Sequence, residues 1–299
     1  MSKFGAGKSG GFCSTNNMLS GSTVLANLAR ALRNQTPQRS SASKRASVCL
    51  ILRINQSLQS HPKGLVYPSA GLDLKDFEGN NIEGVFQGIE NRKGIDDGYQ
   101  DTLECLFIKR ADIENDPWSG QVALPGGKQE EQDDSNDFKT AVREAQEEVG
   151  LNLGDADQYR YLGPMNEREI TGHGKIIKGF AMVPHVFLHM PGLNERPKIF
   201  AQEGEVAGAR WTDLNVLRPS NISWDRIRRE YYWDKGVQKY KQGKYAFPSI
   251  RLPSEGDATC TEHLDFTLWG LTYGVLSDAI TMGGGETIND PPFRKLEDR

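Results

Sequence analysis

Glutamates gather near the end of one segment, where Glu144, Glu147 and Glu148 lie close together in the sequence. Residues 138–149 have helical periodicity, and at about 100° per residue a helix there brings the three carboxylates onto one side. Apolar residues fall on the opposite side: Phe138, Val142, Ala145 and Val149. The stretch therefore predicts an amphipathic helix that presents three acidic side chains together.

Two physical arguments weigh against the simplest alternative, an ordinary solvated acidic face. Like charges four positions apart, such as Glu144 and Glu148, repel by roughly a few tenths of a kcal/mol. Gly150 marks the helix end, where the helix dipole disfavours a carboxylate by up to about 1 kcal/mol. A divalent cation between the carboxylates offsets both effects, and Mg²⁺ prefers a few such oxygen ligands plus substrate phosphates. We therefore predict a metal site on this helix.

The segments around this helix predict a mixture of strands and helices. Buried-strand patterns cover residues 47–54 and 103–108, and a short apolar run at 121–124 stops at the turn formed by Pro125, Gly126 and Gly127. Further strands are expected at residues 159–162, 176–188 and 206–211, and further helices at 22–34, 223–233 and 264–280. Because strands and helices do not alternate regularly, the expected fold class is α+β.

The N-terminal part differs in charge from the rest of the chain. The first acidic residue is Asp73, so residues 1–44 form a basic, flexible arm that is either a targeting segment or a disordered tail. Its short amphipathic helix either serves targeting or packs on the domain. We expect residues 45–282 to form one domain, with a long polar loop inserted at about residues 55–102. Residues 283–299 are expected to be a frayed tail.

The composition of the 299 residues is typical of a globular enzyme, with 37% hydrophobic and 25% charged residues and a net charge of −4. This charge gives no reason to expect nucleic acid or an anionic membrane as a partner, and no apolar run approaches the ~20 residues that span a bilayer. The four cysteines lack metal-ligand spacing and are interpreted as free thiols of a reducing compartment. We expect an intracellular protein, with a mitochondrial address favoured over a cytoplasmic one.

Residues 143–151, R-E-A-Q-E-E-V-G-L, resemble the second half of the Nudix box, and Gly126-Gly127-Lys128 resembles its first half. Gly127 and Arg143 are sixteen positions apart, two more than in the pattern G-x5-E-x7-R-E-U-x-E-E-x-G-U. The first acidic position of the box consequently has no unique match, and three residues are candidates: Glu131, Asp133 and Asp134. The resemblance implies a Nudix-type α/β/α sandwich with a mixed sheet.

The same resemblance implies the roles of the site residues. Glu144, Glu147 and Glu148 would hold Mg²⁺, or Mn²⁺, and Arg143 would orient a carboxylate. Gly126 and Gly127 would form the tight turn between loop and helix, and Lys128 and Arg110 would contact substrate with them. A carboxylate would take the proton of the attacking water, with Glu205 as the candidate base and Glu203 as the alternative.

Two further runs resemble the coenzyme A diphosphatase branch of this family: G-Q-V-A-L-P-G-G-K at 120–128 and L-W-G-L-T at 268–272. They imply a hydrolase of coenzyme A or an acyl-coenzyme A. The alternatives are another nucleoside diphosphate derivative, such as ADP-ribose or NADH, and a Nudix-fold binding domain without catalysis. Asp116 stands where that branch has an arginine. The cations that would replace it, or contact the 3′-phosphate of coenzyme A, are Arg110, Lys109, Lys128, Arg168, Lys175 and Lys178.

Overall fold

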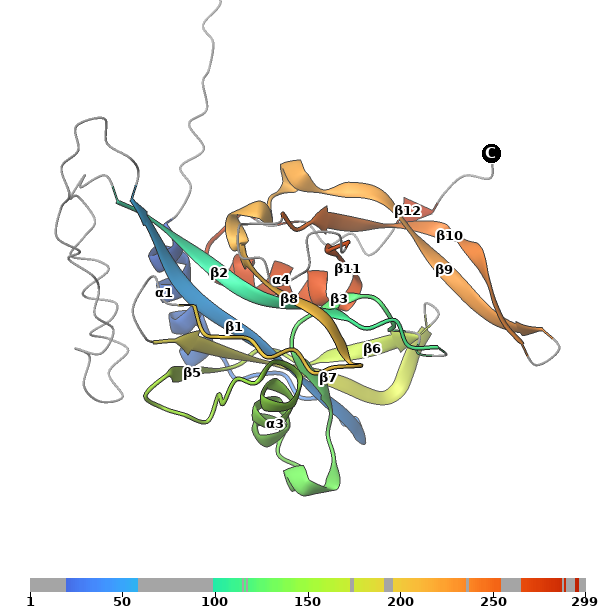
Figure 1. The fold of residues 1–299 in the computed structure, drawn as a ribbon, viewed down its shortest axis with the longest axis horizontal. Coiled ribbons are helices and arrows are strands. Elements are labelled where there is room, and N and C mark those ends of the chain that lie inside the picture. Colours follow the sequence, from blue (N-terminus) through green and yellow to red (C-terminus); the bar gives the residue numbers. More distant parts are fainter. Residues whose placement is uncertain are drawn as a thin grey trace, which may run out of the picture.

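The computed structural model describes residues 20–58, 99–114, 116, 118–172, 175–190, 196–234, 237–253, 265–286, 288 and 294–295. These residues form two β-sheets and the helices that cover them (Figure 1). Most of the insertion expected at about 55–102, and residues 1–19 of the basic arm, lie outside the described residues.

The larger sheet carries the site. Its strands are β1 (Lys44–Leu58), β2 (Tyr99–Arg110), β3 (Val122–Ala123), β4 (Gly126–Lys128), β5 (Tyr159–Pro164), β6 (Arg168–Gly172), β7 (Lys175–His189) and β8 (Val206–Asp213). The central order is β3-β2-β1-β7-β5, while β4 pairs with β1, β6 with β7 and β8 with β2. The pair β1–β7 is parallel and the other pairs are antiparallel, so the sheet is mixed, as expected.

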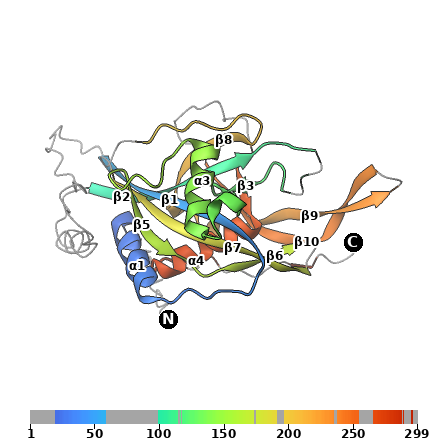
Figure 2. The ribbon, with the colours of Figure 1, turned by 90° about the horizontal axis from the view of Figure 1, so that it is seen from below.

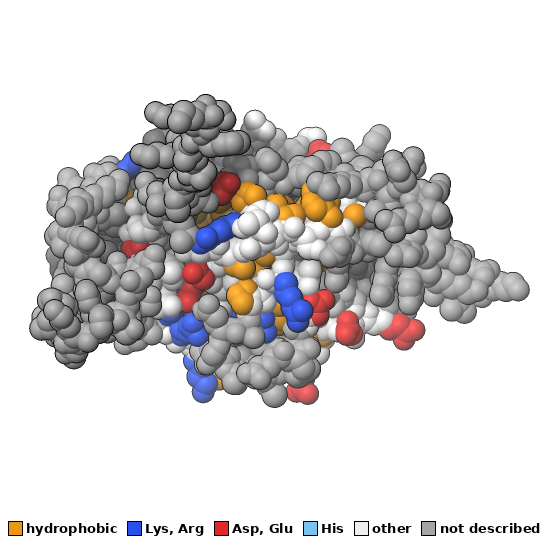
Figure 3. Space-filling model, turned by 90° about the horizontal axis from the view of Figure 1, so that it is seen from above, with side chains coloured by type: hydrophobic (Ala, Val, Ile, Leu, Met, Phe, Trp, Pro, Cys, Tyr) orange, Lys and Arg blue, Asp and Glu red, His pale blue; other side chains and the backbone are white. Residues whose placement is uncertain are grey.

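Helices cover both faces of this sheet, which gives the expected three-layer sandwich (Figure 2). Strand alternation separates the two cores: Cys49 and Ile51 pack toward α3 (Asp137–Val149), whereas Leu50 and Leu52 pack toward α1 (Gly21–Asn34) and α4 (Gly270–Met282). Cys49 and Cys105 are buried free thiols, as the sequence indicated. Figure 3 views the side away from α3, where apolar, basic and acidic side chains are interspersed among the described atoms.

Helix α1 is part of the folded body. Its buried side chains join the same core cluster as the α4 side chains: Leu25, Ala26, Leu28, Ala29 and Leu32. The Asn27 amide donates to the Gly283 carbonyl at 3.1 Å, and the Ser40 amide donates to Glu167 at 2.6 Å. Of the two interpretations of residues 22–34, the structure therefore favours packing on the domain over a free targeting helix. No helix in the described ranges is long and apolar enough to cross a membrane.

The smaller sheet corrects two expected helices. The segment expected to be a helix at 223–233 is instead strand β9 (Ser223–Asp234), which pairs along most of its length with β10 (Val237–Arg251). Cross-strand hydrogen bonds override a local helical preference that is worth only about 1 kcal/mol per residue at most. The expected helix at 264–280 begins later, because β11 (Thr267–Trp269) pairs with β10 before α4 starts at Gly270.

The expected frayed tail is ordered in part. Ile288 is fully buried and its carbonyl accepts a hydrogen bond from Ser277 on α4 at 2.8 Å. Strand β12 (Arg294–Lys295) pairs with β10. Short 3₁₀ helices complete the described elements: η2 (Glu131–Asp133), η3 (Leu214–Val216) and η4 (Pro219–Asn221).

Candidate active site

Helix α3 is delimited by its capping residues and fixed by its apolar side. The Asn136 side chain accepts from the amides of Phe138 and Lys139, and Gly150 ends the helix in the left-handed conformation with φ 73°. Ala141, Ala145 and Val149 are fully buried against the sheet. This is the helix that the periodicity predicts, and its opposite side carries the glutamates.

The Gly-Gly turn brings β4 against both β1 and α3. Gly126 pairs with Val48 of β1 and has φ 150°, and a Cβ there would lie 2.2 Å from the Ser47 carbonyl oxygen. A Cβ on Gly127 would lie 2.5 Å from the carboxylate of Glu144. Gly126 is therefore required by a close approach to the backbone of β1, whereas a side chain at position 127 would displace the carboxylate of Glu144, a candidate metal ligand.

Glu148 is the most buried of the three glutamates, with 2% of its surface exposed. Its Oε2 accepts from the Gly126 amide at 2.7 Å. Burial raises the pKa of Glu148 to about 8. The hydrogen bond from Gly126 acts in the opposite direction and lowers this pKa, while the charge of Glu144 raises it further. Burial also raises the pKa of Glu144. A buried carboxylate whose ionisation is opposed by a neighbouring carboxylate is an environment that a bound cation would relieve.

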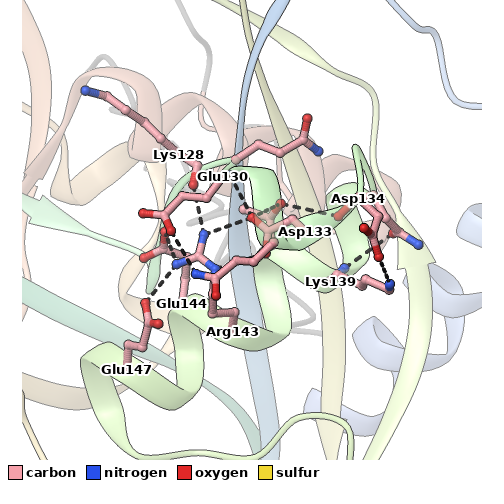
Figure 4. Close-up of polar contacts among 12 residues, drawn as sticks. Lys128, Glu130, Asp133, Asp134, Lys139, Arg143, Glu144 and Glu147 are labelled. Atoms are coloured by element: carbon pink, nitrogen blue, oxygen red, sulfur yellow. Dashed lines mark hydrogen bonds and ion pairs between the residues drawn. The ribbon is translucent and has the colours of Figure 1, made fainter.

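The loop before α3 resolves the ambiguity in the first half of the motif (Figure 4). Arg143 donates from Nε and Nη2 to the two oxygens of Asp133, at 2.9 and 3.0 Å, and from Nη2 to the Lys128 carbonyl at 2.9 Å. Asp133 is 2% exposed, and its hydrogen bonds from Arg143 lower its pKa to about 2. Glu131 and Asp134 are exposed and make no such contact with Arg143. Asp133 therefore anchors Arg143, and the two extra loop residues do not prevent this.

Arg143 also contacts two of the candidate metal ligands. Its Nη1 lies 2.8 Å from Glu147 Oε2 and 3.0 Å from Glu144 Oε1, and 48% of the Glu147 side chain is exposed. Within the described ranges, no three His, Cys, Asp or Glu side chains converge in a metal-ligand arrangement. The carboxylate oxygens of the half-buried Glu144 and the buried Glu148 fit a hard divalent cation, whereas Glu147 would first exchange its contact with Arg143.

The candidate substrate cations separate by sheet face. Arg110 lies on the α3 side, with Nη1 3.9 Å from Glu148 Oε1 and Nη2 3.1 Å from Asp116 Oδ2. Lys109 points to the other face, where its Nζ donates to the Asp265 carbonyl at 2.7 Å. Arg168 pairs with Asp278 of α4, also on that other face. Successive strand residues point to opposite faces, so Lys109 and Arg110 cannot serve the same site.

The remaining candidates are placed less directly. Lys128 is exposed and extends away from the carboxylates (Figure 4), while the side chains of Lys175 and Lys178 lie outside the described residues. Glu203 and Glu205 are both exposed. The charge of Glu205 contributes to the raised pKa of Glu148, and Gln202, in the same turn, donates its amide to the Glu148 carbonyl at 3.0 Å. Glu205 is thus near the carboxylate pair.

A Gly-Gly turn, an acidic loop residue bound to an arginine and a glutamate-bearing helix, together on one face of a mixed sheet, define the class of protein. Residues 96–232 match the family model of the NUDIX domain. This part of the chain is therefore a NUDIX domain. Strand β1 and helices α1 and α4 lie outside the matched range, but β1 is a central strand of the same sheet and the two helices pack on it.

Relatives of the chain include named hydrolases. An uncharacterized protein of Schizosaccharomyces pombe is 30% identical over 184 residues, 58% of this chain and 54% of that protein. Nudix hydrolase 15, mitochondrial, of Arabidopsis thaliana is 28% identical over 197 residues, 66% and 56% respectively. Peroxisomal coenzyme A diphosphatase NUDT7 of Mus musculus is 34% identical over 102 residues, 33% and 39%. The chain spans little more than half the length of the first two relatives.

Proposed function

We propose that the protein is a hydrolase that requires Mg²⁺ or Mn²⁺ and cleaves the diphosphate of a nucleoside diphosphate derivative. The observation that carries the proposal is a pair of carboxylates beside Gly126 and Gly127. Glu148 is buried in the last turn of α3, where the helix dipole disfavours negative charge, and Glu144 is half-buried one turn earlier. Carboxylates in such a place are costly to the fold unless they bind a cation. Nudix hydrolases generally use divalent ions.

Each residue has a proposed role. Glu144, Glu147 and Glu148 hold the ion, which when bound neutralises charge on the diphosphate and polarises its phosphorus–oxygen bonds. Arg143, anchored by Asp133, positions Glu144 and Glu147 through its Nη1. The main chain of Gly126 and Gly127 lets the diphosphate approach, and the exposed Lys128 and the half-buried Arg110 are the cations proposed to contact substrate phosphates.

Proton transfer from the attacking water is proposed for Glu205. Its side chain is exposed, and it lies within electrostatic range of Glu148. Glu203 remains the alternative base. Glu205→Gln and Glu203→Gln separate the two candidates. Substitution of the true base should lower kcat at least about a hundredfold, and substitution of the other residue should leave kcat nearly unchanged.

Coenzyme A or an acyl-coenzyme A is the proposed substrate. The support is the two sequence runs at 120–128 and 268–272, together with the similarity to the mouse coenzyme A diphosphatase over 102 residues. The products would be 3′,5′-ADP and the 4′-phosphopantetheine portion. Contact between the 3′-phosphate and Arg110 or Lys128 predicts that kcat/KM on dephospho-coenzyme A is lower by roughly tenfold.

A panel assay tests the proposal. The full chain is incubated with coenzyme A, ADP-ribose, NADH and inorganic diphosphate, with and without Mg²⁺, and beside a Glu144→Gln/Glu148→Gln variant. The matched control is Glu131→Gln, which removes an exposed carboxylate outside the pair. Metal-dependent release of 3′,5′-ADP supports the substrate. A higher kcat/KM on ADP-ribose or NADH than on coenzyme A would reject coenzyme A as the preferred substrate. If none of the compounds is turned over, the alternative of a Nudix-fold binding domain without catalysis is supported instead.

We also propose an organellar address, with the mitochondrion favoured. The support is the acid-free basic composition of residues 1–44. Because α1 is buried in the domain, the proposed address lies in residues 1–19. A fluorescent fusion of the full chain that stays in the organelle after residues 1–19 are deleted would reject this assignment.

A further inference from the structure

Arg110 lies between two carboxylates that compete for it. Asp116 has the hydrogen bond, at 3.1 Å from Nη2, whereas the Glu148 oxygen is 3.9 Å from Nη1, beyond hydrogen-bond reach. A guanidinium has five N–H donors, and Nε of Arg110 is buried without a hydrogen-bond partner among the described residues. The guanidinium therefore hydrogen-bonds to one carboxylate, forms only a long ion pair with the other, and keeps at least one donor unused among the described residues.

The loop that carries Asp116 is fastened on both sides. Its other oxygen, Oδ1, accepts from the Trp118 amide at 3.0 Å, and Trp118 packs on the main core. The Gly120 amide donates to the Ala111 carbonyl at 3.2 Å, which closes the loop at the end of β2. Asp116 thus has a fixed position relative to Arg110.

Glu148 would take the guanidinium if Asp116 did not hold it. The Glu148 side chain is 3% exposed and the Asp116 side chain is 19% exposed, and the attraction between opposite charges grows as water is excluded. A closed Arg110–Glu148 ion pair would occupy both the carboxylate needed for the ion and the cation needed for the substrate. Keeping the two apart requires a competing anion, and Asp116 is placed to be that anion.

We propose that Asp116 is a positioning residue that holds Arg110 away from Glu148, so that Glu148 stays available to a divalent cation and Arg110 to a substrate phosphate. The inference rests on the proposed metal site. It also gives a reason for an acidic residue at position 116, where the sequence resemblance led us to expect an arginine.

Binding of Mn²⁺ alone, measured by electron paramagnetic resonance on the full chain, tests this arrangement without turnover. Asp116→Asn should raise the Kd for Mn²⁺ roughly tenfold, because Arg110 then closes on Glu148. In the Arg110→Ala background the same substitution should have almost no effect, since no guanidinium remains to compete. Asp116→Glu should stay near the wild type, and Glu114→Gln, on the same loop and exposed, controls for the loss of one negative charge.

Each result decides the matter. An equal rise in Kd with and without Arg110 would mean that Asp116 acts through its charge alone, and a wild-type Kd in Asp116→Asn would mean that it does not act at all; either overturns the inference while the metal site stands. A wild-type chain that binds no Mn²⁺ overturns both the proposed function and this inference. Circular dichroism melts of the variants, expected within a few degrees of the wild type, exclude unfolding as the cause.

Discussion

Helices α1 and α3 pack on opposite faces of the same sheet, yet they bury different chemistry. The buried side chains of α1 that enter the core cluster are all aliphatic: Leu25, Ala26, Leu28, Ala29 and Leu32. Helix α3 buries Ala141, Ala145 and Val149 but also Glu148, which has 2% of its surface exposed. Helix α1 thus contributes to the stability of the fold, whereas α3 bears the energetic cost of a buried carboxylate on one side. The comparison locates function where burial and charge conflict.

The largest expected effect concerns the charge on α3. Glu148→Gln should lower kcat by roughly a hundredfold or more, while the unfolding free energy of the metal-free protein stays equal or rises, because burial disfavours the ionised form of Glu148. Steady-state kinetics at saturating Mg²⁺ and urea unfolding check the two halves of the prediction. A variant with near-normal kcat would remove the metal role of Glu148.

The converse substitution on α1 should change stability alone. Leu28→Ala removes a side chain that is 2% exposed and should lower the unfolding free energy by about 2–5 kcal/mol. Because Leu28 faces the other side of the sheet from Glu148, kcat measured well below the melting temperature should not change. Asn34→Ala, at an exposed position of the same helix, is the control. A loss of kcat without a loss of stability would break the separation of roles.

Asp133 is both buried and charged, and its contribution to the free energy of unfolding should depend on pH. Its folded-state pKa of about 2 lies below the ordinary value, so its charge stabilises the fold above pH ~4 and this contribution disappears as pH falls from about 4 to 2. Asp133→Asn should cost about 2 kcal/mol at pH 7 and little at pH 2. Urea unfolding at both pH values measures this, and an equal difference at both would reject the Arg143 ion pair as the cause.

The smallest expected effect belongs to the exposed Lys128. Its carbonyl holds Arg143, but its side chain extends from the site into solvent (Figure 4). Lys128→Ala keeps the carbonyl and should raise KM roughly threefold with kcat unchanged, since exposed ion pairs contribute below about 1 kcal/mol. Progress curves on coenzyme A would show whether the lysine acts on KM, on kcat or on neither.

The sequence predicts α3 well because one physical signal dominates there. Apolar residues on one side and Gly150 at the end point to the same helix, and tertiary packing agrees with them; in the structure Asn136 caps its start. The choice of Asp133 over its neighbours was not predictable, since it depends on the path of η2. Only the folded loop shows that Asp133 is the buried residue that accepts both hydrogen bonds from Arg143.

Two other features were not predicted because they also depend on tertiary contacts. The residues 223–233 satisfy a helical pattern locally, but β10 lies beside them and supplies a strand partner. A signal was present, because Lys235-Gly236 divides two polar and aromatic runs, as in a hairpin. The pairing of Arg110 with Asp116 was also missed: a basic residue at the end of one strand gives no indication of which loop carboxylate returns to it.

The hydrogen bond from Asn27 to Gly283 joins residues 256 positions apart. A ribosome adding about 5–20 residues per second therefore releases α1 roughly 10–50 s before α4, against which it packs, has been synthesised. For that interval the leucine stripe of α1 has only part of its core to cover it. The early helix is thus structural in the finished protein and accessible in the nascent one, and the last helix closes that period.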